Sequence, residues 1–151
     1  RSVRSEVDFV LTFEELMGLF EAKEVDFASL PNNPEDAFNN ASADARGFAA
    51  SGGVAQAVVN AIKKMDPDRE VKVMSAQGLA DCKKMMMMAK AGKYNGYLLE
   101  GMACPGGCIA GAGTLADPAK SAMMLTKYKN EATMKVATET PYKDSLDLLK
   151  Y

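Results

Sequence analysis

Hydrophobic and polar residues follow two different periods along the chain, and the first change of period falls near residue 12. Val7 to Leu11 is a short β-prone run, which predicts a strand. Thr12 then offers a helix N-cap, and Glu15 three residues later completes a capping-box pattern. Apolar residues recur at helical spacing from about residue 13 to residue 23. We therefore expect a strand that passes into an amphipathic helix, with the helix packed on a sheet.

The rest of the chain is an alternation of helical and strand patterns separated by turn residues. Residues 25–45 carry prolines and asparagines and predict a long irregular connection. The elements expected after it are a helix from Ser51 to Lys64 ended by Met65-Asp66-Pro67, a strand over Glu70–Ala76, a helix from Gly78 through Lys90, a strand over Tyr94–Met102, and helices over Asp117–Met134 and Pro141–Leu149. This order predicts an α/β fold, a single lobe with a small, mainly parallel sheet flanked by helices. In such a sheet binding groups gather at the carboxyl ends of the strands, and Cys104 follows one of these ends.

Composition and charge limit the kinds of molecule that the chain is expected to bind. The chain has 151 residues, of which 48% are hydrophobic and 25% charged, as in an ordinary folded domain. A net charge of -2 leaves no basic surface for phosphates, so we expect no nucleic-acid partner. No apolar run approaches the ~20 residues of a membrane span, and a cytoplasmic location is expected.

The chain has no histidine, which excludes histidine-dependent nucleophiles, bases and metal ligands. Its three cysteines are an odd number, so reduced thiols are favoured over a disulfide scaffold. We expect Cys82 to be a small buried apolar residue, and the run Met85-Met86-Met87-Met88 to fill the core rather than to bind a soft metal.

The most informative segment is Cys104-Pro105-Gly106-Gly107-Cys108. A disulfide is one interpretation, although a thioredoxin-type pair has two intervening residues rather than three. Structural zinc is a second, but a closed zinc site needs four protein ligands. An iron-sulfur site is the third and the favoured one, because thiolates are its usual ligands. The Pro-Gly-Gly turn would let the backbone approach the inorganic sulfides and donate N–H groups to them.

Three segments resemble the iron-only hydrogenases. Residues 100–113, Glu-Gly-Met-Ala-Cys-Pro-Gly-Gly-Cys-Ile-Ala-Gly-Ala-Gly, resemble the family's last cysteine motif, E-x-M-A-C-P-G-G-C-x-x-G-x-G. Residues 46–54, Arg-Gly-Phe-Ala-Ala-Ser-Gly-Gly-Val, are similar to its F-G-A-T-G-G-V segment, and residues 8–15 to its D-x-V-L-T-x-x-E entry. The resemblance implies that residues 1–151 are the carboxyl-terminal lobe of the two-lobed catalytic domain, with residues 114–151 as a helical tail.

The resemblance also implies a cofactor and roles for particular residues. The family's hydrogen cluster is a four-iron four-sulfur cubane joined through a cysteine thiolate to a two-iron unit that carries carbon monoxide, cyanide and a dithiolate. Carried over by position, Cys104 and Cys108 are metal ligands, and Cys108 is the bridging thiolate at the reaction centre beside Met102. Phe48 and Ala49 are expected to wall the apolar pocket of the two-iron unit, and Gly106 and Gly107 to lie against the cofactor.

Departures from the family pattern bear on what the chain can do alone. Ala49, Ala55 and Ala112 replace residues common in the family, and the two earlier cysteine motifs, T-S-C-C-P and P-C-x-x-K, are absent. We therefore expect a fragment or one part of a split enzyme, metal-free and inactive alone, that needs the missing amino-terminal half. A ferredoxin-like electron carrier and maturation proteins are the other implied partners. Two alternatives stay open: a hydrogen-sensing regulatory member of the family, and a non-catalytic iron-sulfur assembly protein.

Overall fold

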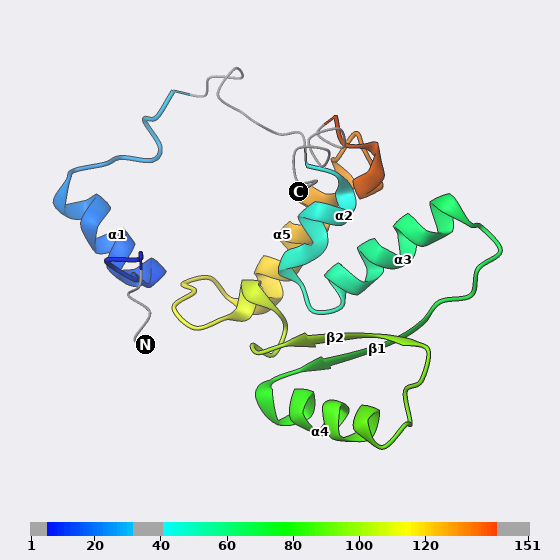
Figure 1. Cartoon of the computed structure of the whole chain (residues 1–151). Coiled ribbons are helices and arrows are strands. Elements are labelled where there is room, and N and C mark those ends of the chain that lie inside the picture. Colours follow the sequence, from blue (N-terminus) through cyan, green and yellow to red (C-terminus); the bar gives the residue numbers. More distant parts are fainter. Residues whose placement is uncertain (1–5, 32–40, 142–151) are drawn as a thin grey trace.

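The described residues form a parallel sheet of two strands, which lies between two helices. The computed structural model describes residues 6–31 and 41–141 (Figure 1). Strand β1 (Lys72–Gln77) pairs in parallel with β2 (Tyr97–Met102), with Ser75 opposite Glu100 and Gln77 opposite Met102. The helix that connects them, α4 (Leu79–Lys90), covers one face of the sheet, and α3 (Gly53–Met65) lies on the other (Figure 1). The expected α/β lobe with a small parallel sheet is confirmed.

Several shorter elements contact α3. Helix α2 (Ala43–Arg46) and the 3-10 turn η1 (Gly47–Ala49) lead into it, and α5 (Pro118–Asn130) packs against α2 and η1. Two further 3-10 turns follow along the chain: η2 (Cys108–Ala110) comes after β2, and η3 (Ala137–Glu139) comes after α5. The core is formed by small side chains, among them Ala55 and Val59 of α3 and Ala76 of β1.

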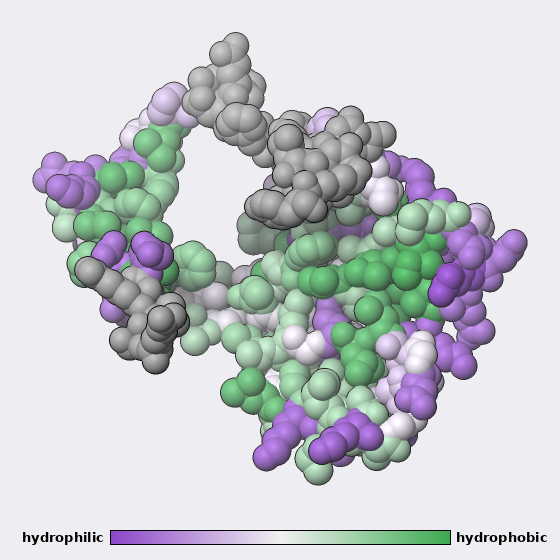
Figure 2. Space-filling model, viewed as in Figure 1, coloured by the Kyte–Doolittle hydropathy of each residue, from purple (hydrophilic) through white to green (hydrophobic). Residues whose placement is uncertain are grey.

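Helix α1 (Phe13–Ala22) begins where the capping box predicts. The Glu15 N–H donates to Thr12 Oγ1 at 3.2 Å, and the Thr12 N–H donates to Glu15 Oε2 at 2.7 Å. The expectation that this helix packs on the sheet is wrong, because α1 buries none of its residues and stands away from the sheet (Figure 1). Three of its apolar side chains, Phe13, Met17 and Leu19, remain exposed, and Figure 2 shows apolar surface in this part of the molecule.

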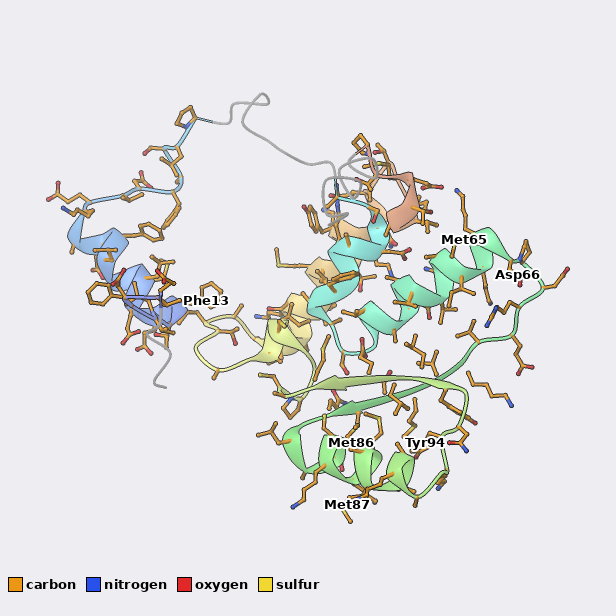
Figure 3. The ribbon with its side chains drawn as sticks, in the orientation of Figure 1. Phe13, Met65, Asp66, Met86, Met87 and Tyr94 are labelled. Atoms are coloured by element: carbon orange, nitrogen blue, oxygen red, sulfur yellow. The ribbon has the colours of Figure 1, made fainter. Side chains whose placement is uncertain are left out.

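Several other expectations are corrected by the structure. Residues 7–11 form no strand, because a strand needs a neighbour for its backbone groups and the sheet lies elsewhere. The methionine run is only partly core: Met85 is 4% exposed, whereas Met86 and Met87 are 58% and 64% exposed (Figure 3). One turn of helix, α2, interrupts the connection predicted over 25–45. Helix α5 ends at Asn130 instead of Met134, and the helix predicted over 141–149 lies almost wholly outside the described residues.

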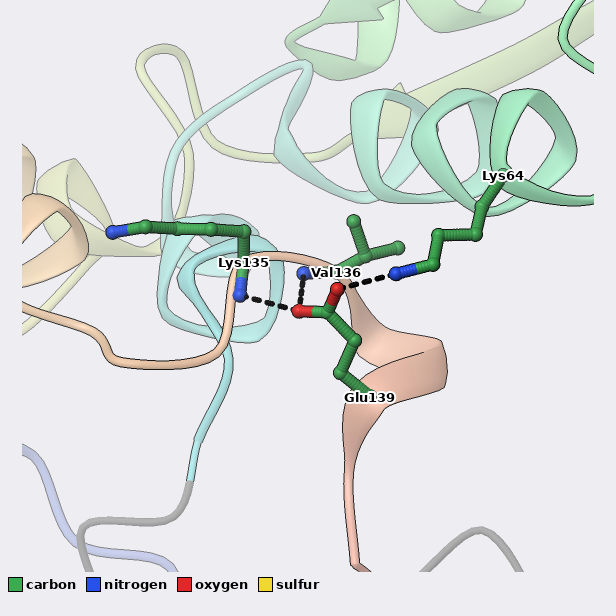
Figure 4. Close-up of polar contacts among 4 residues, drawn as sticks. All are labelled: Lys64, Lys135, Val136 and Glu139. Carbon is green, nitrogen blue, oxygen red and sulfur yellow. Dashed lines mark hydrogen bonds and ion pairs between the residues drawn. The ribbon is translucent and has the colours of Figure 1, made fainter.

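A polar cluster at Glu139 ties η3 to the end of α3 (Figure 4). The Glu139 carboxylate accepts hydrogen bonds from the Lys64 ammonium and from the backbone N–H groups of Val136 and Lys135. These bonds favour the charged form, so the pKa of Glu139 is lowered to about 2. No helix within residues 6–31 and 41–141 is long and apolar enough to cross a bilayer.

Candidate functional site

The cysteine loop begins with a tight turn directly after β2. The Gly107 N–H donates to the Cys104 carbonyl at 3.0 Å, with Pro105 and Gly106 as the two central residues. Gly106 has φ +86°, and this combination of a proline followed by a left-handed glycine is typical of a type II turn. The turn places Cys104 and Cys108 at either side of a compact backbone loop, and η2 continues from Cys108.

The turn packs directly on the segment that precedes α3. Ala50 and Gly107 form an isolated antiparallel bridge, and the Ser51 N–H donates to the Gly106 carbonyl at 3.3 Å. A Cβ on Gly107 would lie 2.5 Å from the Ala49 carbonyl oxygen, so only glycine allows this approach. The structure thus brings together the two segments, residues 46–54 and 100–113, that the sequence places far apart.

A buried carboxylate from β2 caps α3, and the sequence analysis did not identify it. The N-cap residue, Gly52, has no side chain to accept from the first helical N–H groups. Glu100 Oε1 accepts from the N–H groups of Val54 and Ala55, each at 3.0 Å. The signal available in the sequence was a glutamate inside a strand together with a helix start that lacks a capping side chain.

The backbone N–H groups of the turn already have acceptors within the chain. The Gly106 N–H donates to Gln77 Oε1 at 2.6 Å, and the Gly107 N–H donates to the Cys104 carbonyl. Both N–H groups therefore donate within the chain, and their approach to inorganic sulfides stays a prediction. Gln77, at the end of β1, is a second contact that the sequence analysis did not identify.

An apolar pocket of about 550 Å³ lies beside the second cysteine. Ala49 and Cys108 line the same pocket, and α1 forms much of its remaining wall. Phe13 lies at the end of α1 that approaches this pocket (Figure 3). The Cys108 side chain is exposed, whereas Cys104 is half-buried. A thiol that opens into a mostly apolar hollow suits a cofactor that must be kept away from water.

Two predicted site residues lie away from this pocket. Phe48 is 43% exposed and is not among the residues that line it. Met102 is half-buried and lines a separate hollow of about 270 Å³ between α3 and β2. Its carbonyl accepts from the Gly78 N–H at 2.8 Å and from Cys82 Sγ at 3.5 Å. Cys82 is half-buried rather than fully buried, and its thiol donates to the backbone carbonyls of Ala76 and Met102.

The donor set fits partial ligation of an iron-sulfur group. Cys104 and Cys108 offer two thiols beside a glycine turn, which is the chemistry such a group needs. A cubane requires four ligands, and within the described residues no group of three or more Cys, Asp or Glu side chains could hold a metal. The remaining ligands of a complete cluster would have to come from outside the described part of this chain.

Comparison with known proteins shows the family of the chain. Residues 1–112 match the family described as "Iron only hydrogenase large subunit, C-terminal domain". The chain is 32% identical over 135 residues to the NADP-reducing hydrogenase subunit HndD of Solidesulfovibrio fructosivorans, and 29% identical over 135 residues to the periplasmic [Fe] hydrogenase large subunit of Nitratidesulfovibrio vulgaris (strain Hildenborough). Each match covers 72% of this chain, but only 23% and 32% of these two relatives. The chain belongs to the family of iron-only hydrogenase large subunits, as a C-terminal domain.

Proposed function

We propose that this chain is one part of an iron-only hydrogenase that catalyses the reversible conversion of dihydrogen to two protons and two electrons. Its contribution would be two cysteine ligands of the hydrogen cluster. The observation that carries this proposal is the Cys104–Gly107 turn held against residues 49–51, which leaves the Cys108 thiol open to an apolar pocket. Family membership supports the reaction class.

Two cysteines of the chain would bind the cluster, and neighbouring residues would keep water away from it. Cys104 would ligate the four-iron four-sulfur cubane, and Cys108 would ligate it while bridging to the two-iron unit. The cluster, when bound, supplies an open iron position for hydrogen and a route for electrons. Ala49 would exclude water on the pocket side of Cys108, since both residues line the same apolar hollow. Phe48 and Met102 would help to enclose the two-iron unit. For this, their side chains would have to move toward the pocket beside Cys108, or another segment would have to cover them.

Partners are part of this proposal, and they are supported by the coverage of only 23% and 32% of the relatives above. The amino-terminal half of the catalytic domain would supply the other cubane ligands and close over the loop of Cys104 and Cys108. Alone, the chain would be inactive. A ferredoxin-like carrier would exchange electrons with the assembled protein, and maturation proteins would deliver the two-iron unit. The cytoplasm remains our proposed compartment, although one relative is named as periplasmic.

Expression with and without the upstream half, in cells that contain the maturation proteins, tests this proposal. We expect hydrogen evolution and bound iron only when both halves are present. Cys104→Ser and Cys108→Ser should each abolish hydrogen evolution and lower the iron content. Cys82→Ser is the matched control, because its thiol only donates to backbone carbonyls and a hydroxyl can do the same. Hydrogen evolution that survives both loop substitutions would refute the assignment.

A further inference from the structure

Glu100 stands out as a buried charge that the proposed chemistry does not use. It is 8% exposed, and it lies on β2 four residues before Cys104. Burying a carboxylate is costly unless hydrogen bonds and opposite charge offset the loss of water. Here two N–H groups at the start of a 13-residue helix supply both, since the helix dipole is positive at that end.

The contacts of Glu100 connect the two segments that build the pocket. Its Oε1 atom holds the first turn of α3, which directly follows residues 49–51. Those residues in turn contact Gly106 and Gly107 through the bridge and the Ser51–Gly106 hydrogen bond. The backbone of Glu100 therefore belongs to β2, which leads to Cys104. Its side chain binds the start of α3, next to the residues on which the cysteine turn packs.

We infer that Glu100 is a positioning residue, which sets the placement of Cys104 and Cys108 relative to Ala49 by fixing the start of α3 against β2. This inference rests on the proposed function, because it assigns the placement to cluster binding. The reach of the side chain does the positioning, because it brings Oε1 to the N–H groups of Val54 and Ala55, whereas Oε2 is buried without a hydrogen-bond partner within the described residues.

Reach and charge are separated by two substitutions. Glu100→Gln keeps the length of the side chain and an acceptor oxygen but removes the charge. Glu100→Asp keeps the charge but withdraws the carboxylate by one methylene from the N–H groups of Val54 and Ala55. Glu70→Asp is the matched control, because Glu70 is an exposed glutamate ahead of β1.

The experiment uses the chain assembled with its upstream half and the maturation proteins. Hydrogen exchange at Val54 and Ala55 should be at least about tenfold faster in Glu100→Asp than in the wild type or in Glu100→Gln, because the shorter side chain no longer accepts from these two N–H groups. Infrared bands of the iron-bound carbon monoxide and cyanide should shift, and iron content should fall, in Glu100→Asp alone. Glu70→Asp should match the wild type in every readout.

The outcomes distinguish the inference from the proposed function. A wild-type assembly without iron or such infrared bands would overturn the proposed function, and this inference with it. A loaded wild type with unchanged exchange and unchanged bands in Glu100→Asp would overturn only the positioning role. A loaded wild type in which Glu100→Gln is as impaired as Glu100→Asp would also overturn it, since the charge would then matter rather than the reach.

Discussion

Ala50 pairs with Gly107 in an antiparallel bridge, although the two residues belong to separate sequence segments. This pairing makes the residues before α3 and the cysteine turn into one structural unit. Because a Cβ on Gly107 would lie 2.6 Å from the Ser51 nitrogen, the close contact depends on the absence of a side chain at this position. The position of Cys108 is therefore set by the backbone contact as well as by its own neighbours.

Gly107→Ala should be much more destabilising than Gly96→Ala. Both glycines have positive φ, +94° and +77°, and Gly107, with ψ -168°, lies in a region that is essentially open to glycine alone, so its alanine meets a backbone cost of about 1–3 kcal/mol. At position 107 the Cβ also meets the Ala49 carbonyl, whereas at position 96 no atom lies within 4 Å. We expect a further loss of about 1–3 kcal/mol from overpacking in Gly107→Ala. Urea unfolding of both variants measures the difference, and equal values would contradict the close contact.

Cys108 should react with iodoacetamide faster than Cys82 in the iron-free chain. Cys108 is exposed, whereas the half-buried Cys82 thiol lies 3.5 Å from the Met102 carbonyl and 3.6 Å from the Ala76 carbonyl. Access to the thiol limits alkylation. Peptide mass spectrometry after timed quenching gives both rates, and urea-unfolded protein, in which the rates should become similar, is the control. Faster labelling of Cys82 in the folded chain would count against the described loop.

Glu139 should make the stability of the chain depend on acid pH. Its pKa is lowered to about 2, first by the hydrogen bond from Lys64 and then by the N–H groups of Val136 and Lys135 (Figure 4). A lowered folded pKa means that the stabilisation is present above the unfolded pKa and is lost as pH falls toward 2.

The Glu139→Gln variant isolates this effect, because it retains the shape of the side chain without the titration. The wild type should be more stable than the variant at pH 7, and the two should converge as pH falls from about 4.5 toward 2. Thermal unfolding across this range measures the gap. A gap that stays constant down to pH 2 would show that the carboxylate is not preferentially stabilised in the fold.

Thr12→Ala should unfold α1 selectively. The loss of an N-cap of this kind costs about 1 kcal/mol. No residue of helix α1 is fully buried, so tertiary packing compensates little for the lost cap. Hydrogen exchange should become faster over residues 16–22 and remain unchanged in α3. Thr126→Ala is the control, because Thr126 lies inside α5 and its hydroxyl donates to the Ala122 carbonyl rather than capping the helix. Unchanged exchange over residues 16–22 would mean that contacts other than the cap hold α1.

The sequence by itself determined the elements whose signals are local. The capping box at Thr12, the helix start at Gly52-Gly53, the stop at Asp66 and the glycine before α4 depend only on residues within one or two turns of each other. The cysteine turn could also be predicted from the sequence, because proline followed by two glycines is a local turn signal.

Only the tertiary structure decided which distant surfaces meet. The sequence pattern predicted a strand over residues 7–11, but a strand needs a neighbouring strand to pair with. It also predicted that the whole methionine run lies in the core, but a side chain is buried only where another surface covers it. Glu100 became the cap of α3, and Gly107 the partner of Ala50, because β2 and the start of α3 are brought together by packing. Such contacts join residues far apart in the chain, and no local pattern records them.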